Sequence, residues 1–356
     1  MKFGFQLPTG MEGLIVPTPF FQPIDFLSAA RTGEKLGYDS VWGNDHYAAQ
    51  NYVREKYGAS PNFFEVMTIL AAVASVTQRI QLGTSVLVLP MRDVVLAARQ
   101  IATLDQLSSG RLLVGVGIGA YKEEYEAARP ELAHKNRGDM LEEGLALLNR
   151  LLMEDEVTFR GKYYHVEELS LHPKPVQAPF PLLVGGHQKF GIDRAVRYGQ
   201  GWIPGWRPFI ELRDWIALLR EKAAAAGRDP QKMIVAPQFS CLVAKTKEEA
   251  AQRYQQSGMV SHRVSLAYTG RDPALALENN LIGSPESILD QLERLGDYGV
   301  DHLSALSFCV NSVGEFDEQL HFFAEEVMQP YRRAHGNQTP THNPTEKRRQ
   351  SNENDR

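Results

Sequence analysis

The feature of this sequence that most restricts its fold is a regular alternation of short apolar segments with helical ones. Eight segments have the character of strands, because apolar and β-branched residues crowd between turn-forming residues. They are residues 3–7, 38–42, 79–89, 111–119, 181–186, 201–204, 233–244 and 300–308. Strands of this kind, separated by helices, form a parallel sheet that is buried on both faces. Since eight parallel strands can close on themselves, we expect an α/β fold, a (β/α)₈ TIM barrel with insertions.

The segments between these strands carry apolar residues at helical spacing. The clearest helix follows Ser284, which can cap it, and starts at Pro285, a residue suited to the first helical position. Gly299 follows its end, before the last strand. Further helices are expected at residues 23–36, 62–76, 93–107 and 137–152.

Three stretches depart from the alternation. Residues 157–168 alternate around a central glycine and predict a β-hairpin. Residues 250–283 are polar and weakly periodic, so we expect an insertion that acts as a lid. From residue 334 onward the sequence is polar without apolar periodicity, which is typical of disorder. The sequence therefore predicts one domain over residues 1–333 and a disordered tail over residues 334–356.

Composition excludes several classes of function. A net charge of −5 leaves no general basic surface for nucleic acid or anionic lipid. The sequence has neither an apolar run long enough to span a membrane nor the apolar core of a signal peptide. Cys241 and Cys309 lie far apart without metal-ligand spacing, which favours buried thiols in a reducing compartment. We expect a cytoplasmic protein without a metal site, and neither nucleic acid nor a membrane as a partner.

Function in such barrels gathers at the carboxyl ends of the strands. Asp45 and His46 follow the second strand, where adjacent acidic and imidazole groups can hold a proton and orient each other. The same residues also fit a polar loop in which Asp45 caps a turn. Residues 115–120, GVGIGA, let a ligand approach the backbone closely. They also match a dinucleotide-binding fingerprint, but the strand-terminal acid that this fingerprint needs does not follow.

Later strand ends offer further candidates. Gly185, Gly186 and His187 lead directly into a helix, whose N-terminal amides suit a phosphate, although a tight turn needs the same residues. Trp202, Trp206 and Arg207 surround the sixth strand end and can either wall an aromatic ligand or close the barrel mouth. His134 and Arg137, near the start of a helix, can face an anionic cofactor or lie in solvent.

Taken together, several segments resemble the luciferase-like monooxygenase family. This family includes flavin-dependent monooxygenases and deazaflavin-dependent reductases. The resemblance rests on the order and spacing of GYDSVWGNDH, RIQLGTSVLVLP, AARQIATLDQLSSGRLLVGVGIG, VTFRGKYYHVEELSLHPKPVQAPFPLLVGG, GQGWIP and IGSPESILDQLERLGDYGVDHL, and it covers roughly residues 1–333.

The resemblance implies a flavin site. Asp45 and His46 are then catalytic residues near the reactive edge of the isoalloxazine ring, with His46 in proton transfer. A non-proline cis peptide between Ser85 and Val86 presses on the back of the ring. The cofactor-binding residues implied with it are Ser85, Val86, Tyr121, Glu123, His134, Gly185, Gly186, His187 and Gly205.

Two cofactors occur in the family. The segment HKNRGDMLEEGLALLNRLL resembles members assigned FMN, whereas the Asp-His pair is also prominent in deazaflavin members. Basic residues for the longer anionic tail of the deazaflavin coenzyme F420 are few: Lys189, Arg207 and Lys174. We therefore expect a monooxygenase that uses reduced FMN, supplied by a separate flavin reductase, and O2 on a small organic substrate. The resemblance also implies a homodimer. The alternatives are a deazaflavin-dependent dehydrogenase or reductase that transfers hydride, and a flavin-binding protein without turnover.

Overall fold

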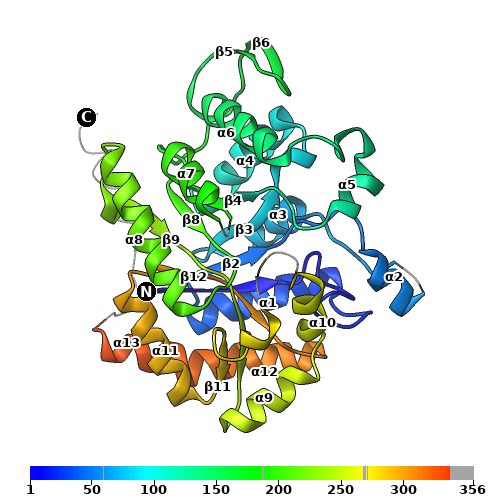
Figure 1. Ribbon diagram of the computed structural model, residues 1–356, viewed down its shortest axis with the longest axis vertical. Coiled ribbons are helices and arrows are strands. Elements are labelled where there is room, and N and C mark those ends of the chain that lie inside the picture. The colour runs from blue at the N-terminus through cyan, green and yellow to red at the C-terminus, as the bar shows by residue number, and fades with distance from the viewer. Residues whose placement is uncertain (59, 187, 268–269, 271, 337–356) are drawn as a thin grey trace, which may run out of the picture.

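The computed structural model describes residues 1–58, 60–186, 188–267, 270 and 272–336. Its main sheet curls into a barrel in which every pairing is parallel (Figure 1). The expected (β/α)₈ TIM barrel is confirmed. Ten strands follow one another around it in the order β11 (Leu281–Gly283), β10 (Phe239–Val243), β12 (His302–Phe308), β1 (Lys2–Leu7), β2 (Ser40–Gly43), β3 (Gln81–Val88), β4 (Leu112–Gly117), β7 (Leu182–Gly185), β8 (Gly201–Ile203) and β9 (Ile234–Val235).

The seventh predicted strand, 233–244, is divided into β9 and β10, which corrects the expectation of one strand. Pro237 lies in the break and has no amide hydrogen for a ladder bond. β9 pairs with β8, whereas β10 pairs with β12. Between them, the Pro237 carbonyl accepts from the Ser304 amide at 3.1 Å, and the Gln238 amide donates to the Pro204 carbonyl at 3.0 Å. This segment therefore joins the last strand to the sixth and closes the barrel.

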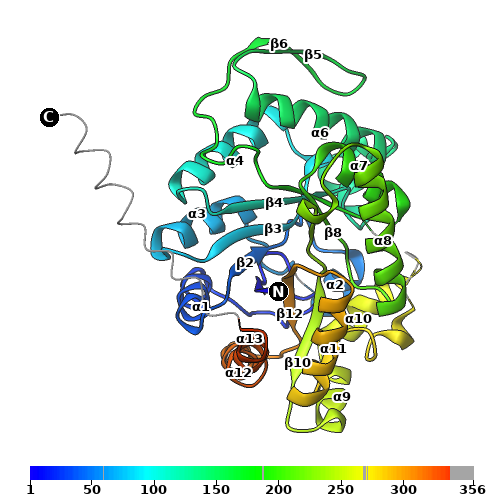
Figure 2. The same cartoon turned by 90° about the vertical axis from the view of Figure 1, so that its left-hand side faces the viewer.

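Helices surround the strands on the outside (Figure 2). The first four predicted helices are confirmed within a few residues, and the fifth starts at Pro285 as expected, with the Ser284 hydroxyl accepting from the Ser287 amide. The short helices α2 and α5 are not anticipated by the sequence. The helices are α1 (Pro23–Leu36), α2 (Asn51–Tyr57), α3 (Val66–Val76), α4 (Val94–Leu107), α5 (Lys122–Ala128), α6 (Arg137–Met153), α7 (Lys189–Tyr198), α8 (Phe209–Ala225), α9 (Lys247–Gln255), α10 (Gly258–Ser265), α11 (Pro285–Asp297), α12 (Val313–Phe323) and α13 (Gln329–Ala334).

The two internal departures from the alternation have different outcomes. The hairpin is confirmed as β5 (Val157–Arg160) and β6 (His165–Leu169), and its turn is tied to α6 because the Glu143 carboxylate accepts from the Tyr163 and Tyr164 amides. The insertion 250–283 is only partly an insertion, since residues 250–255 complete α9 and the remainder contains α10 and the extra strand β11. The predicted tail lies outside the described residues from 337 onward.

Trp42 fills the barrel interior below the strand ends. A Cβ atom on Gly83 would lie 2.1 Å from its ring, so only glycine leaves room there. Its indole nitrogen donates to the Ser40 hydroxyl at 2.6 Å, and this oxygen lies 2.7 Å from Nε2 of His302. The rest of this interior cluster is apolar: Leu113, Leu183, Ile203, Ala236 and Ala305. The barrel is therefore packed solid beneath its carboxyl end.

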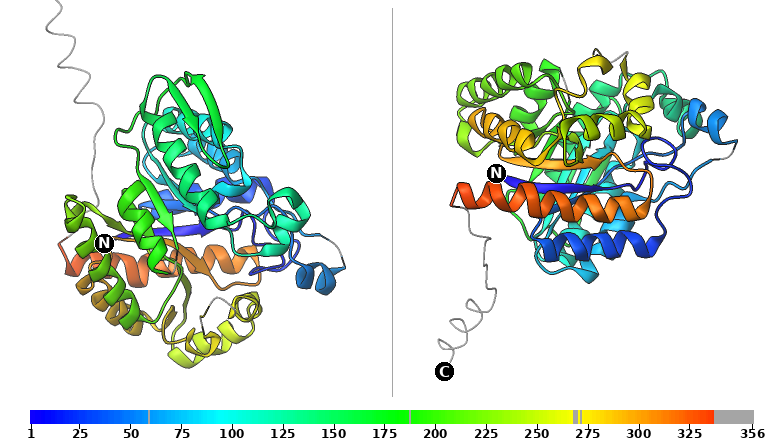
Figure 3. Two further views of the ribbon diagram at one scale, coloured as in Figure 1. Left: turned by 45° about the horizontal axis from the view of Figure 1, so that its top comes forward. Right: turned by 90° about the horizontal axis from the view of Figure 1, so that it is seen from below.

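Two further features bear on where function lies. Figure 1 shows α2, α5 and α10 gathered at one end of the barrel and the N-terminus at the opposite end, and both views in Figure 3 agree. Among the described residues, no helix combines the length and apolar character that crossing a lipid bilayer requires.

Candidate functional site

A cavity of about 620 Å³ lies at the carboxyl ends of the strands. Its volume falls in the range usual for sites that bind cofactors and small molecules. Every strand position of the barrel supplies part of the lining, either from the strand or from the residues that follow it. These contributions include Gln6, Asn44, His46, Ser85, Val86, Gly117, Gly119, Ala120, Tyr121, Gly185, Gly186, Ile203, Gly205, Trp206, Gln238, Phe239 and Ser307.

His46 lines this cavity and is held by a carboxylate from a neighbouring element. Its Nδ1 lies 3.0 and 3.1 Å from the two carboxylate oxygens of Glu124, which is buried on α5. Glu124 also accepts from the Tyr47 amide at 3.1 Å, so the loop after β2 and the helix after β4 are joined at this point. The pair fixes the imidazole orientation, and Nε2 has no carboxylate partner among the residues that the structure describes.

The environment of His46 favours its charged form. Burial by itself disfavours the imidazolium, but the Glu124 carboxylate, by charge and hydrogen bonding, and the charge of Asp45 outweigh it. The pKa of His46 is therefore raised above its ordinary value. A group that titrates above its usual range, inside a cavity, can hold a proton near neutral pH and deliver it.

Asp45 does not share the cavity with His46. Its carboxylate accepts from the Val88 amide at 2.9 Å and from Arg92 Nε and Nη2 at 3.0 and 2.8 Å, and the group is buried. The Arg92 guanidinium also reaches Glu65 at 2.9 Å. These contacts tie the β2 loop to the end of β3, and Asp45 is not among the described residues that line the cavity, so its catalytic role stays a prediction.

Ser85 and Val86 form part of the cavity floor, and the peptide bond between them is cis, as the resemblance implies. Val86 lies against two glycines, because Cβ atoms placed on Gly117 and Gly185 would come within 2.7 and 3.0 Å of its side chain. The Ser85 hydroxyl is buried and finds no hydrogen-bond partner among the described residues. The floor is thus smooth and apolar, with one polar atom left to meet a ligand.

One side of the cavity has the features of an anion site. Gly186 packs directly against Gly191, since a Cβ on either would lie 3.0 Å from the other backbone, and this close approach brings the start of α7 to the cavity. The N-terminus of α6, capped by Asn136, lines the same side. Arg194 of α7 adds a positive charge. Helix N-termini and an arginine together suit a phosphate.

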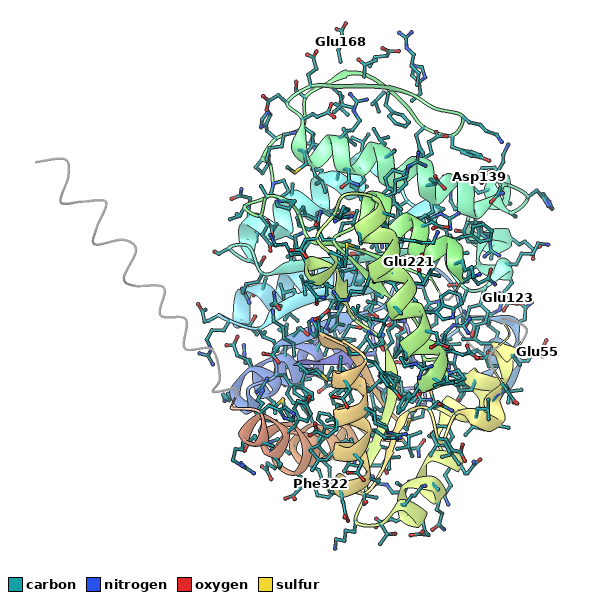
Figure 4. The ribbon with its side chains drawn as sticks, turned by 60° about the vertical axis from the view of Figure 1, so that its left-hand side comes forward. Glu55, Glu123, Asp139, Glu168, Glu221 and Phe322 are labelled. Atoms are coloured by element: carbon teal, nitrogen blue, oxygen red, sulfur yellow. The ribbon has the colours of Figure 1, made fainter. Side chains whose placement is uncertain are left out.

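Several predicted binding residues lie elsewhere. Glu123 accepts from the Asn51 amide at 3.3 Å, and His134 is exposed on the surface. Neither residue is among those that line the cavity. Figure 4 shows Glu123 and, farther up, Asp139 along the same edge of the molecule. His187 lies outside the described residues.

The basic residues considered for the anionic tail of coenzyme F420 do not line the cavity either. Lys174 donates to the carbonyls of Leu151 and Glu154 on the helical shell. Arg207 pairs with Glu211 and stacks over the Trp215 ring, and neither it nor Lys189 lines the cavity. Arg194, which the sequence analysis did not consider, lines the cavity on the phosphate side.

Helix α10 forms the remaining wall. Four residues of this segment line the cavity at helical spacing: Met259, His262, Arg263 and Leu266. The Tyr121 hydroxyl lies 3.1 Å from His262 Nδ1 and 3.0 Å from the Ser265 hydroxyl, so the loop after β4 is bonded to this helix. Among the described residues of 250–283, those that line the cavity therefore lie on α10 or at its C-cap, Leu266.

The sequence missed Glu124, Arg194 and the α10 residues. A signal for the first was present, because Tyr121, Glu124 and Tyr125 have the spacing of one helical face. Arg194 lies on α7, several residues after Gly185 and Gly186, and no sequence motif fixes its spacing from these glycines. The four α10 residues mix apolar and polar types, so their shared face gives no hydrophobic pattern.

Comparisons with known proteins agree with this geometry. The chain matches a family model described as luciferase-like monooxygenase over residues 1–302. It is 26% identical to an FMNH2-dependent dimethylsulfone monooxygenase of Pseudomonas putida, over 92% of this chain and 94% of that protein. It is 29% identical to an F420-dependent glucose-6-phosphate dehydrogenase of Amycolatopsis mediterranei, over 78% of each. The crystal structure of monooxygenase RslO1 from Streptomyces bottropensis shares the fold, with a TM-score of 0.77 at 24% identity, covering 93% of this chain and 100% of that one.

Proposed function

The chain belongs to the luciferase-like monooxygenase family and is an oxidoreductase, and we propose that it uses reduced FMN and O2 to oxygenate a small organic substrate. When bound, reduced FMN supplies the electrons and activates O2. The protein binds and orients both partners and protects the reaction from water. The observation that carries this proposal is a cavity with donors for an anion on one side, an apolar floor at Ser85 and Val86, and a histidine whose pKa is raised.

The residues present fit FMN. Gly185, Gly186 and Gly205 leave room for its phosphate end, and Arg194 and the N-termini of α6 and α7 supply the donors. The flat ring suits the floor at Ser85 and Val86, where the unpartnered Ser85 hydroxyl can bond a polar edge of the ring. Tyr121 lines the cavity beside this floor and completes the cofactor-binding set.

His46 is the proposed proton donor. Glu124 holds Nδ1, so the proton that can move is the one on Nε2. Because the pKa of His46 is raised, a larger share of the protein carries this proton near neutral pH. Asp45 acts through position: by holding Arg92 and the Val88 amide, it sets the backbone from which His46 projects.

Charge at the phosphate side favours FMN over coenzyme F420. Among the described lining residues on that side, Arg194 is the cation and Asp139 is an anion. Arg194 also lies 3.6 Å from Glu142, which takes up part of its charge. FMN ends in one phosphate, whereas F420 continues into an anionic oligoglutamate chain that needs further positive charge along its exit. The cations for that exit are scarce here.

The same proposal extends to partners. Reduced FMN reaches this chain from a separate flavin reductase, and the chain works as a cytoplasmic homodimer in which residues 1–333 are the catalytic domain. The family resemblance supports these points. Sedimentation of the purified protein, with and without FMN, measures the oligomeric state directly, and a monomer at micromolar concentration contradicts the homodimer.

The experiment that tests the cofactor is a pair of anaerobic titrations. Reduced FMN and reduced F420 are each added to the purified protein, and binding is followed by calorimetry. We expect reduced FMN to bind at least tenfold more tightly than F420, and O2 to be consumed once air is admitted with substrate. Tight binding of F420 without binding of reduced FMN contradicts the monooxygenase and identifies a hydride-transferring dehydrogenase. Binding of FMN without turnover on any substrate leaves a flavin-binding protein.

A further inference from the structure

We infer that the α10 side of the cavity recognises the substrate by an anionic head group, a carboxylate or a sulfonate, which Arg263 and Trp206 bind. This inference rests on the proposed function, because it assigns the α10 side to the substrate and the α7 side to the cofactor. It names the class of substrate: an amphiphile with one small anionic end and an apolar body.

Arg263 is set into the cavity by two contacts that fix its guanidinium. Its Nη2 donates to the buried Ser240 hydroxyl at 2.5 Å, and its guanidinium carbon lies 5.4 Å from the centre of the Trp206 ring. Both of these contacts are to neutral groups, and together they fix the orientation of the positively charged guanidinium. A planar, oriented arginine is the side chain best suited to a carboxylate or sulfonate, because it can donate two parallel hydrogen bonds.

Trp206 provides an independent observation. It is 2% exposed and lines the cavity, and its indole N–H is buried without an acceptor among the described residues. An unsatisfied buried donor costs free energy, so such a group usually has a ligand or a water molecule as its partner. Because the indole can only donate, the ligand atom that it meets is an acceptor.

The walls around these donors are apolar. Met259 and Leu266 flank Arg263 on α10, and Leu14 and Ile15 approach from the loop after β1. That loop packs tightly on α10, since a Cβ on Gly258 would lie 2.5 Å from the Ile15 carbonyl oxygen. An anionic head held between two donors therefore places its apolar body against these side chains, where burial of apolar surface adds affinity.

The carboxylate among the described lining residues is Asp139, and it belongs to the α6 N-terminus on the cofactor side. The polar groups that line the cavity from β1 and β12, Gln6 and Ser307, are neutral and bonded to each other. The α10 side therefore attracts anions, and in a partly buried site this attraction is stronger than in water.

The test measures binding of simple probes to the protein loaded with oxidised FMN. Octanoate, octane-1-sulfonate and 1-octanol are titrated by calorimetry, and FMN affinity is measured separately by flavin fluorescence. We expect at least one of the two anions to bind more than tenfold tighter than 1-octanol. R263Q should weaken binding of that anion by roughly tenfold to a hundredfold, the range for a hydrogen bond to a charged group, and leave 1-octanol and FMN unchanged.

Further variants separate recognition from packing. R263K keeps the charge and should recover part of the affinity. W206F keeps an aromatic ring but removes the indole N–H, and it should lose roughly fivefold in affinity for the anion. R213Q, at an exposed arginine of α8 that pairs with the adjacent Asp214, is the matched control and should change nothing. Thermal unfolding of each variant verifies that it is folded.

Three results overturn the inference. Equal affinity for 1-octanol and both anions shows that charge is not recognised. An equal loss for all three probes in R263Q shows that Arg263 only supports the wall. A loss of FMN affinity in R263Q assigns Arg263 to the cofactor. If FMN itself does not bind, the proposed function fails, and titration of octanoate against the cofactor-free protein then decides the anion site separately.

Discussion

Each end of this barrel holds a histidine, and the surroundings of the two histidines shift their pKa values in opposite directions. At the carboxyl end, Glu124 contacts His46 and its charge raises the pKa of the imidazole. At the amino end, His302 meets the Ser40 hydroxyl instead of a carboxylate, and burial, with smaller effects of Lys2 and the N-terminal amine, lowers its pKa to about 3. Burial therefore lowers the pKa of an imidazole, and carboxylates beside it reverse the direction of the shift.

The same contrast governs packing. At the amino end, glycines such as Gly83 serve to admit the large Trp42 ring, which fills the interior. At the carboxyl end, Gly117 and Gly185 border an open cavity instead. Glycine in a strand has a positional meaning in both places, because each allows something to approach the backbone closely. One end is thus built for stability and the other for a ligand, as is usual for this fold.

The largest expected effect comes from removing the histidine at the carboxyl end of the barrel. H46A removes the proposed proton donor, so turnover with reduced FMN should fall by roughly 10²- to 10⁴-fold, the usual contribution of a general acid or base. FMN affinity should change less than turnover, because His46 lies away from the anion site. Steady-state kinetics and FMN titration of the same preparation measure both. A collapse of FMN binding with turnover intact would make His46 a binding residue.

The second prediction concerns the carboxylate that distinguishes the two histidines. E124Q keeps a hydrogen-bonding group beside His46 but removes the charge, so the pKa of His46 should fall and turnover at neutral pH should drop roughly tenfold to a hundredfold. The pH–rate limb that reports protonated His46 should move to lower pH. E123Q, one residue earlier on the outward face of α5, is the control and should leave the pH profile in place. An unmoved limb in E124Q contradicts the pairing.

Glu123 and Glu124 also show how much of the site could be predicted from the sequence. The barrel is predictable because each strand is a short apolar run with its own turn signals, and the strand ends that carry His46, Ser85 and Gly185 follow from it. Choosing Glu124 over Glu123 requires the phase of α5, and the spacing of Tyr121, Glu124 and Tyr125 reveals this phase only once the short segment is recognised as a helix. The resemblance supplied Glu123 instead, and the structure places that side chain outside the cavity.

The cavity-lining residues of α10 were not predicted from the sequence for a related reason. Met259 and Leu266 are separated by His262 and Arg263 on the same face, so the face that looks inward is partly polar, as a ligand requires. Hydrophobic periodicity detects faces that pack against protein, and it fails where the partner is a small molecule. The extra strand β11 is only three residues long and is set by pairing with β10, a long-range contact that local sequence does not encode.

The third prediction sharpens the contrast at the amino end. The pKa of His302 is lowered in the fold, so its stabilising effect is present above the ordinary pKa near 6.5 and is lost as the pH falls toward 3. Between pH 6.5 and pH 5 this group should cost about 2 kcal/mol of unfolding free energy. H302Q cannot take up a proton, so urea unfolding of this variant should show a correspondingly smaller loss over the same interval. Equal pH dependence of the two proteins contradicts the assignment.

His46 should behave in the opposite sense in the same measurement. Its pKa is raised, so its contribution to stability is fully present below pH 6.5 and is lost as the pH rises through the folded-state value. Comparing the unfolding free energies of wild type and H46Q from pH 6 to pH 9 isolates the contribution of His46. For each variant, the difference in unfolding free energy from wild type is plotted against pH. If the plots for H46Q and H302Q slope in the same direction, the contrast between the two histidines is contradicted.

The smallest expected effect lies within the carboxyl end, between the two arginines that share Glu142. Arg194 Nε lies 3.6 Å and Arg197 Nη1 3.0 Å from its carboxylate, but only Arg194 lines the cavity, whereas Arg197 is 68% exposed. R194Q should weaken FMN binding about tenfold, because one charged contact to the phosphate is lost while the helix N-termini remain. R197Q should leave FMN affinity within twofold, since its charge is screened by solvent. Riboflavin, which lacks the phosphate, should bind both variants and wild type alike. If R194Q weakens riboflavin as much as FMN, Arg194 supports the cavity wall rather than the phosphate.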